Sequence, residues 1–123
     1  MPAALVIDDN FHNRHIFRIA LEHAGYGVTE SDDGLKGLNE LKRSAYELVI
    51  LDLRMPGMDG SDVLRIMRKT EEWQTTQVVV VTANPHMVTD DIRTMADYVL
   101  QKPVDIPTFS ALAQRLYARN IQN

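Results

Sequence analysis

Residues 47–52 read Glu47-Leu48-Val49-Ile50-Leu51-Asp52, an apolar run that ends in a carboxylate. Three more apolar runs end at a polar side chain: Ala4-Leu5-Val6-Ile7 before Asp8-Asp9, Gln77-Val78-Val79-Val80-Val81 before Thr82, and Tyr98-Val99-Leu100-Gln101 before Lys102. Runs of this kind, β-branched and nearly all apolar, are typical of strands buried on both faces of a parallel sheet. Because parallel strands end at one edge, we expect these polar groups to gather where open α/β sheets bind ligands.

Helical patterns separate these runs, and a short fifth strand is predicted at 27–30. Five strand–helix units joined by right-handed crossovers predict one doubly wound (βα)5 domain of the α/β class, flavodoxin-like, with a parallel five-stranded sheet of order 2-1-3-4-5. In that order the first and third strands are neighbours, which would bring Asp8, Asp9 and Asp52 to one crevice. At 123 residues, the whole chain, 1–123, is expected to form a single domain.

The predicted helices follow from spacing and end signals. A helix over 11–24 carries four residues at helical spacing: Ile16, Ile19, Ala20 and His23, the last at the edge of the core. A helix over 33–44 contains Gly34 and Gly37, which lower its helix propensity. A helix over 61–70 would take Gly60 or Ser61 as its cap. The segment 85–95 is short and mixed in pattern and is the predicted mobile element, whereas a regular amphipathic helix begins at 106.

Composition excludes several classes of function. Thirteen Lys and Arg against seventeen Asp and Glu give a net charge of −4, which argues against direct binding to nucleic acid or to an anionic membrane. The absence of cysteine excludes disulfides, thiolate metal sites and a cysteine nucleophile. Apolar runs stay far below the ~20 residues of a membrane-spanning helix, and the start at Met1 lacks the pattern of a signal peptide. We therefore expect a soluble, cytoplasmic protein with a true amino terminus.

The acidic cluster itself predicts a metal. Three carboxylates in one crevice repel one another and raise their pKa values unless a cation compensates. Mg²⁺ fits, because it binds one or two carboxylates and leaves coordination positions for water and phosphate oxygens. Asp52 is the best nucleophile candidate, since carboxylates can form aspartyl phosphates. Thr82 and Lys102 would then surround the transferred phosphoryl group and neutralise its oxygens.

Four separated motifs agree with one known geometry. They are Val6-Ile7-Asp8-Asp9-Asn10, Leu51-Asp52-Leu53-Arg54-Met55-Pro56-Gly57-Met58-Asp59-Gly60, Val81-Thr82-Ala83 and Lys102-Pro103. In type and order they resemble the receiver domain of two-component response regulators, the CheY-like phosphoproteins of phosphorelay signal transduction. The resemblance covers essentially the whole chain.

This resemblance implies a specific chemistry. Asp52 would be the phosphoacceptor, taking a phosphoryl group from a sensor histidine kinase, a phosphotransfer protein or a small acyl phosphate. Asp8, Asp9, Asp52 and the backbone carbonyl of Arg54 would bind Mg²⁺. The phosphorylated domain would act as a conformational switch that changes binding of a partner protein or output domain. It would not be an enzyme, apart from slow autodephosphorylation. A homodimer that forms on phosphorylation is also compatible with such a switch.

Further residues take their expected roles from the same resemblance. Thr82, Ala83 and Lys102 would contact the phosphoryl group and carry the switch, and the Lys102–Pro103 bond is expected to be cis, which only X-Pro bonds reach cheaply. Arg54 and Asn84, each two residues beyond a site residue, would tune dephosphorylation by controlling the access of water.

Two features depart from the family pattern. Val99 stands where the family usually has its aromatic switch residue, and Tyr98 lies one position earlier, so either, or neither, could take part in switching. The segment from Thr82 to Lys102 is also short, which predicts a truncated or irregular fourth helix.

Two other functions compete with a phosphorylation switch. An aspartate-dependent phosphohydrolase would commonly carry an Asp-x-Asp pair on its first strand, whereas here the nucleophile candidate lies on the third strand and is followed by Leu53 and Arg54. A degenerate receiver could serve as a constitutive interaction module, and failure to bind Mg²⁺ would favour it. The chain could also be the amino-terminal receiver of a longer regulator.

Overall fold

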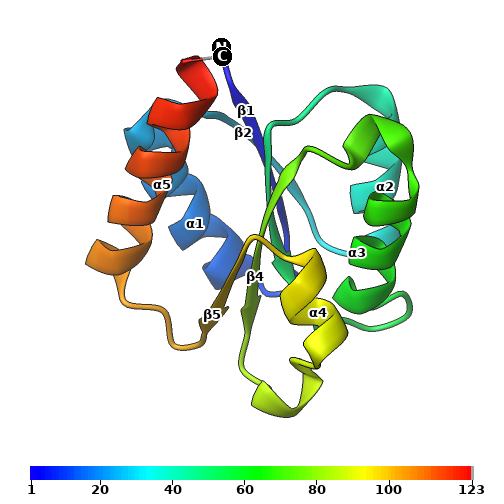
Figure 1. The fold of residues 1–123 in the computed structure, drawn as a ribbon. Helices are drawn as coiled ribbons and strands as arrows, with labels where there is room; N and C mark the ends of the chain where they lie inside the picture. Colours follow the sequence, from blue (N-terminus) through cyan, green and yellow to red (C-terminus); the bar gives the residue numbers. More distant parts are fainter. Residues whose placement is uncertain (123) are drawn as a thin grey trace.

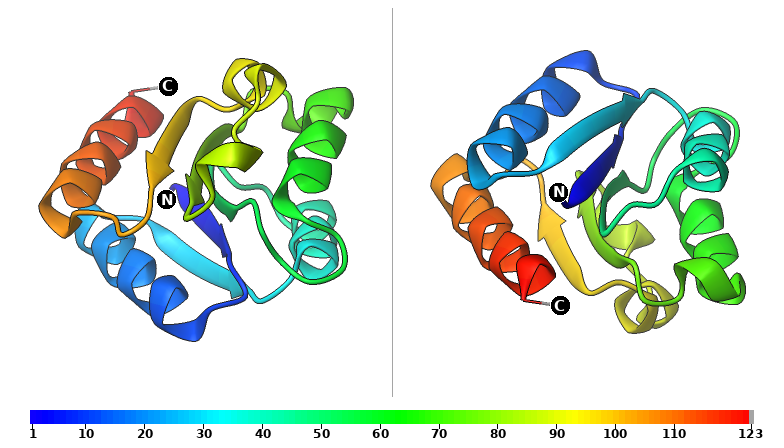
Figure 2. Two further views of the ribbon diagram at one scale, coloured as in Figure 1. Left: turned by 90° about the horizontal axis from the view of Figure 1, so that it is seen from below. Right: turned by 90° about the horizontal axis from the view of Figure 1, so that it is seen from above.

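Five parallel strands form one sheet in the order β2-β1-β3-β4-β5, which confirms the predicted order and the flavodoxin-like fold. The computed structural model describes residues 1–122, and Figure 1 shows the sheet between two groups of helices. The strands are β1 (Ala3–Ile7), β2 (Gly27–Ser31), β3 (Leu48–Asp52), β4 (Gln77–Thr82) and β5 (Tyr98–Gln101). Their carboxyl ends share one edge, which faces the viewer in the view from below in Figure 2.

Helices cover both faces of the sheet. One face carries α1 (Phe11–Ala24) and α5 (Ile106–Ile121), and the other carries α2 (Gly34–Arg43), α3 (Gly60–Lys69) and α4 (Asp90–Met95). Successive side chains of a strand point to opposite faces, so Leu5 and Ile7 pack on the α2–α4 side while Ala4 and Val6 pack on the α1 and α5 side. Both sides are buried, which explains why the strands are apolar at nearly every position.

The predicted inner face of α1 was wrong. Ala20 is buried as expected, but its buried companions are Phe17 and Leu21, whereas Ile16 and Ile19 are 41% and 48% exposed. His23 is exposed as well. Both sets of residues have helical spacing, so the sequence pattern alone does not choose between them. Packing makes the choice, because the ring of Phe17 lies 4.8 Å from that of Phe109 on α5.

The glycines of α2 serve close packing on the sheet. A Cβ atom on Gly37 would lie 2.5 Å from Cδ1 of Ile7, so only glycine lets the helix approach β1 this closely. The helix forms despite its low propensity because Asp33 caps it, accepting a hydrogen bond from the Lys36 backbone N–H at 2.8 Å. Burial of Leu38 and Leu41 against the sheet adds apolar stabilisation.

The start of α3 also differs from its prediction. Neither Gly60 nor Ser61 is the cap, since both come after Asp59, whose side chain accepts from the Asp62 backbone N–H at 3.0 Å. The Asp62 carboxylate accepts in turn from the Asp59 N–H at 3.4 Å, and this completes a capping box. Asp62 stands here at the position where a capping box usually has Glu or Gln.

The segment between β4 and β5 is irregular, as its length predicted. The expected helix over 85–95 is split into a 3-10 turn, Pro85–Met87, and the six-residue helix α4. Thr89 caps α4 by accepting from the Ile92 backbone N–H, and Ile92 is the buried residue of that helix. A second 3-10 turn, Glu71–Trp73, connects α3 to β4. Within residues 1–122, no helix combines the length and the apolarity that crossing a bilayer requires.

Candidate functional site

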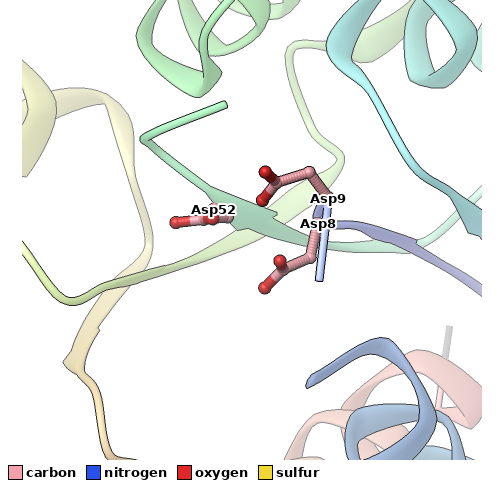
Figure 3. A group of neighbouring side chains, drawn as sticks. All are labelled: Asp8, Asp9 and Asp52. Carbon is pink, nitrogen blue, oxygen red and sulfur yellow. The ribbon is translucent and has the colours of Figure 1, made fainter. Parts of the chain in front are cut away.

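Two strand ends bring three carboxylates together. Ile7 and Leu51 are partners in the register between β1 and β3, so the residues that follow them, Asp8 and Asp52, lie side by side. One carboxylate oxygen from each of Asp8, Asp9 and Asp52 lies within 4.8 Å of the others. Figure 3 shows the three side chains turned toward a common space. The predicted convergence of these residues is therefore present in the fold.

Asp8 is held by contacts on every side. It is only 2% exposed, and its backbone N–H donates to the Ser31 carbonyl at 3.2 Å. Its Oδ1 accepts from the Asn10 backbone N–H at 2.9 Å, and its Oδ2 accepts from Nζ of Lys102 at 3.0 Å. Its backbone carbonyl accepts from Nη1 of Arg14 at 2.7 Å. Asp9, in contrast, is exposed.

Lys102 connects the two buried carboxylates. Its ammonium lies 3.0 Å from Oδ2 of Asp8 and 3.5 Å from Oδ2 of Asp52. The position of Lys102 follows from β5, because its backbone N–H donates to the Thr82 carbonyl at the end of β4. The next peptide bond, Lys102–Pro103, is cis. A cation fixed between two acids is well placed to contact an anion that binds there.

Asp52 sits in an environment that favours its neutral form. The pKa of Asp52 is raised from 3.8 to about 6, because burial and, second, the charge of Asp8 together outweigh the opposing effects of Lys102 and the Arg54 backbone N–H. Excess negative charge of this kind is relieved by a bound cation. The donor set consists of oxygens only, which fits Mg²⁺ and not a soft metal. Asp8, Asp9 and Asp52 would hold the ion, and the Arg54 carbonyl is the fourth candidate ligand.

The loop after Asp52 approaches the site closely at Gly60. A Cβ atom on Gly60 would collide with the Asp52 carbonyl oxygen and would lie 2.8 Å from Cα of Leu53. The Gly60 N–H donates to the Leu53 carbonyl at 2.8 Å, which closes the loop at the start of α3. Arg54, within this loop, is exposed. In the sequence Gly60 was a cap candidate and the last residue of the motif around Asp52, but its close packing against the Asp52 backbone was missed.

The end of β4 contributes the remaining candidates. Thr82 is 1% exposed, and its hydroxyl oxygen accepts from the Asn84 backbone N–H at 3.0 Å. Ala83 is exposed, and Asn84 is half-buried. These residues follow β4, the strand next to β3, so they flank the carboxylates at the same sheet edge.

Comparison with known proteins agrees with this geometry. The model of the response regulator receiver domain family matches residues 4–114. The chain belongs to this family.

Relatives support the assignment. The uncharacterized transcriptional regulatory protein YkoG of Bacillus subtilis is 34% identical over 119 residues, which cover 94% of this chain and 51% of YkoG. The DNA-binding dual master transcriptional regulator RpaA of Synechocystis is 34% identical over 122 residues, which cover 97% of this chain and 50% of RpaA. This receiver domain thus spans about half the length of these curated relatives.

Solved structures share the fold. The response regulator protein TrrA of Thermotoga maritima superposes with a TM-score of 0.83 at 28% identity, covering 94% of this chain and 99% of TrrA. Chemotaxis protein CheY4 of Vibrio cholerae superposes with a TM-score of 0.81 at 24% identity, covering 94% of this chain and 98% of CheY4.

The receiver domain places its two switch candidates on opposite faces of β5. Val99 packs in the core beneath α2, α3 and α4, whereas Tyr98 packs in the core beneath α1 and α5. The Tyr98 hydroxyl accepts from Nη1 of Arg119 on α5 at 3.5 Å. Because neighbours along a strand point to opposite faces, the Tyr98 ring is on the wrong side of the sheet to occupy the place of Val99.

Arg14 is the site-adjacent residue that sequence reasoning missed. It lies in the first turns of α1, where the helix dipole disfavours a positive charge, and this unfavourable position is the one signal that a specific partner exists. The structure supplies two hydrogen-bond partners, the Asp8 carbonyl and, at 3.1 Å from Nε, the carboxylate of Glu30 on β2, and the guanidinium also lies over the Phe11 ring, 5.7 Å from its centroid.

Proposed function

We propose that this receiver domain accepts a phosphoryl group on Asp52 and uses it to change its binding to a partner protein or output domain. The observation that carries the proposal is the triad of carboxylates whose oxygens lie within 4.8 Å of one another, with the Lys102 ammonium between two of them. Mg²⁺ is the proposed cofactor. The solved structure of TrrA is a complex with Mg²⁺-BeF, which supports that choice.

The proposed reaction moves one phosphoryl group. An ionised oxygen of Asp52 forms a bond to phosphorus while the P–N bond of a phosphohistidine, or the P–O bond of a small acyl phosphate, breaks. The leaving imidazole or carboxylate keeps the electron pair of the broken bond. Asp52 needs no general base, because above about pH 6 its carboxylate is ionised. Bound Mg²⁺ would supply positive charge toward the phosphoryl oxygens.

The residues of the chain then hold the product. Lys102, already 3.5 Å from Asp52, would pair with a phosphoryl oxygen. Thr82 and Ala83 would contact the same group at the end of β4, and Arg54 and Asn84 would limit the access of water. A change at Thr82 would pass to the segment Ala83 to Asp97, which contains the short helix α4. Phosphorylation can shift this equilibrium only by the difference in its interaction with the two conformations.

The proposed partners follow from the chemistry. Receiver domains interact with histidine kinases or phosphotransfer proteins, and we propose one of these as the donor. The output would be binding, with no catalysis beyond slow loss of the domain's own phosphoryl group. Dimerisation on phosphorylation is an alternative form of the same output.

Intact mass spectrometry tests the proposal. The chain is incubated with a small acyl phosphate with and without Mg²⁺, beside an Asp52→Asn variant. Gain of one phosphoryl group by the original chain, dependent on Mg²⁺ and absent from the variant, is the expected result. Gain of the same mass by Asp52→Asn would overturn the assignment of Asp52. If the folded original chain gains nothing from the acyl phosphate or from a histidine kinase, the switch proposal fails.

A further inference from the structure

Arg14 makes the contact that fixes the backbone between two proposed Mg²⁺ ligands. Its Nη1 donates to the carbonyl oxygen of Asp8 at 2.7 Å, across the start of α1. That carbonyl belongs to the peptide group that joins Asp8 to Asp9. Because a peptide group is planar, holding its oxygen fixes the orientation of the plane and therefore the directions in which both side chains leave the backbone.

The guanidinium of Arg14 is itself held in place. Its Nε donates to Oε1 of Glu30 at 3.1 Å, and the Arg14 side chain is only 13% exposed. Glu30 lies on β2, which pairs with β1 directly beside Val6. Burial tends to raise the pKa of Glu30, but hydrogen bonds from Arg18 and Arg14 outweigh burial and lower it, so this carboxylate stays ionised. Arg14 thus links Glu30 on β2 to the Asp8–Asp9 peptide through two hydrogen bonds.

The other contacts of Asp8 do not reach the oxygen of the Asp8–Asp9 peptide, although the bond from the Asn10 N–H to Oδ1 restrains the turn that contains this peptide. The bonds to Lys102 and to the Asn10 N–H fix the Asp8 carboxylate, and the Asp8 N–H fixes the preceding peptide. Asp9 is exposed, so its direction depends on the peptide that precedes it. Arg14 is the side chain that holds that peptide in the described part of the chain.

We propose that Arg14 is a positioning residue for the cation site: it orients the Asp8–Asp9 peptide so that both carboxylates face one ion. The inference rests on the proposed Mg²⁺ site and adds a residue to its support. Outer contacts that orient metal ligands typically change metal affinity by about 10–100-fold when they are removed.

Electrostatics alone predicts the opposite result, an increase in Mg²⁺ affinity when Arg14 is replaced by a neutral residue. Arg14 carries a positive charge close to the ion, and charges of like sign repel. Neutralising Arg14 would remove that repulsion and leave the Glu30 carboxylate with one cation fewer. If charge were the dominant effect, an Arg14→Gln variant would bind Mg²⁺ more tightly. If orientation dominates, it binds more weakly.

Arg18 offers a matched control. It binds the same carboxylate through the other oxygen, at 2.9 Å from Nη1 to Oε2 of Glu30, and its remaining partner is Glu22 on the same helix. It carries the same charge as Arg14 but makes no contact with the Asp8 carbonyl. Arg18→Gln therefore makes the same change in net charge and also removes a Glu30 contact, without removing a contact to the Asp8–Asp9 peptide.

The experiment is a calorimetric titration of the full chain with Mg²⁺, for the original sequence and for Arg14→Gln, Arg18→Gln and Arg14→Lys. We expect Arg14→Gln to weaken Mg²⁺ binding about tenfold, and Arg18→Gln to leave it within a factor of about two. Arg14→Lys should recover part of the loss, because an ammonium can still donate to the Asp8 carbonyl. Thermal unfolding of each variant confirms that the titrated protein is folded.

The outcomes separate the inference from the proposed function. Equal or tighter Mg²⁺ binding by Arg14→Gln, with the original chain binding normally, would overturn the role of Arg14 alone. An equal loss in Arg14→Gln and Arg18→Gln would also overturn it, since charge or Glu30 would then be the cause. Failure of the original folded chain to bind Mg²⁺ would overturn the metal site itself, and the inference with it.

Discussion

The carboxylate site and the segment from Ala83 to Asp97 are built differently, although the segment begins at the same edge of the sheet. It ends at the opposite edge, where the Asp97 N–H donates to the Val78 carbonyl at 2.9 Å. At the site, the ends of β1 and β3 are in register, and Asp8 has partners at its N–H, its carbonyl and both carboxylate oxygens. The segment consists of a 3-10 turn and the six-residue α4, and its one fully buried large side chain is Ile92. Parts of a protein that move are drawn from its regions of low local stability. The contrast therefore predicts that the segment moves more readily than the carboxylate site.

Arg68 fixes the end of the segment that lies farther from the carboxylate site. From α3, its guanidinium donates to the carbonyls of Met95 at 2.8 Å and Thr76 at 2.9 Å, and it pairs with Asp97 at 3.2 Å. The Asp97 carboxylate also accepts from the Val78 N–H at 2.7 Å. These bonds hold the end of the segment to β4, so movement should be concentrated before Met95.

The largest effect expected from a change at the carboxylate site itself lies at Gly60. We expect Gly60→Ala to destabilise the protein by roughly 3 kcal/mol, because the added methyl group meets backbone atoms of Asp52 and Leu53 that cannot move aside independently. Urea unfolding measures the change. Gly57→Ala is the control: its φ of 73° strains alanine, but no atom lies within 4 Å of the new methyl group, so it should cost about 1 kcal/mol. Equal losses for the two variants would refute the tight contact at Gly60.

The second effect concerns the charge of Asp52 in protein kept free of metal by a chelator. Between its ordinary pKa of 3.8 and its native value of about 6, the folded state binds more protons than the unfolded state, so stability falls as pH rises through this window. Above about pH 6 Asp52 is ionised in the folded state, and the full destabilisation from its buried charge is present. Asparagine does not ionise, so Asp52→Asn should be more stable than the original chain at pH 8 by about 2 kcal/mol.

Urea unfolding at two pH values checks this. The advantage of Asp52→Asn should shrink as pH falls from about 6 toward 4, since Asp52 is then protonated and neutral like asparagine. Saturating Mg²⁺ should reduce the advantage too, because the ion stabilises the original chain. An advantage that does not depend on pH, or a loss of stability, would contradict the assigned environment of Asp52.

A third test compares one buried isoleucine from each region. Removing a buried isoleucine side chain usually costs about 2–5 kcal/mol, and we expect Ile50→Ala in β3 to fall within that range. Ile92→Ala in α4 should cost only about 1 kcal/mol in urea unfolding, because a short helix can detach locally. Amide exchange should speed up in α4 alone, and phosphorylation of Asp52 should be retained. Similar losses for the two variants would show that α4 is part of the cooperative core.

The smallest expected effects are kinetic. Arg54 is exposed and Asn84 is half-buried, each two residues beyond a site residue, and neither side chain belongs to the buried core. We expect Arg54→Ala and Asn84→Ala to change the rate at which the phosphorylated chain loses its phosphoryl group by about threefold to tenfold each, without changing stability beyond about 0.5 kcal/mol. Mass spectrometry over time, after removal of the donor, gives the rates. Unchanged rates in both variants would exclude water access as their role.

The sequence predicted the placement of the site residues better than the packing of the core. Asp8, Asp9, Asp52 and Lys102 could be found because each follows an apolar run, and parallel strands bring such ends together whatever the details of the core. The bounds of α1 followed from its pattern as well. The order of the sheet followed from the number of units and the handedness of the crossovers.

The sequence failed to predict which way certain side chains point and what they contact. Ile16 and Phe17 both fit a helical stripe, and only contact with Phe109 selects Phe17. Arg14 gave no periodic signal, since its partners are a backbone carbonyl and a carboxylate on another strand. The sequence drew attention to Gly60, but it could not show that the Asp52 backbone packs against its Cα. That contact depends on how the loop between Asp52 and Gly60 closes.

The measurement that tests the central claim most directly is the location of the phosphoryl group within the chain. The phosphorylated protein is reduced with borohydride, which converts an aspartyl phosphate to homoserine, and the chain is then digested and sequenced by mass spectrometry. Homoserine at position 52, dependent on both the donor and Mg²⁺, is the predicted result. An intact Asp52 in protein that has gained a phosphoryl group, with the modification at any other residue, would contradict the account.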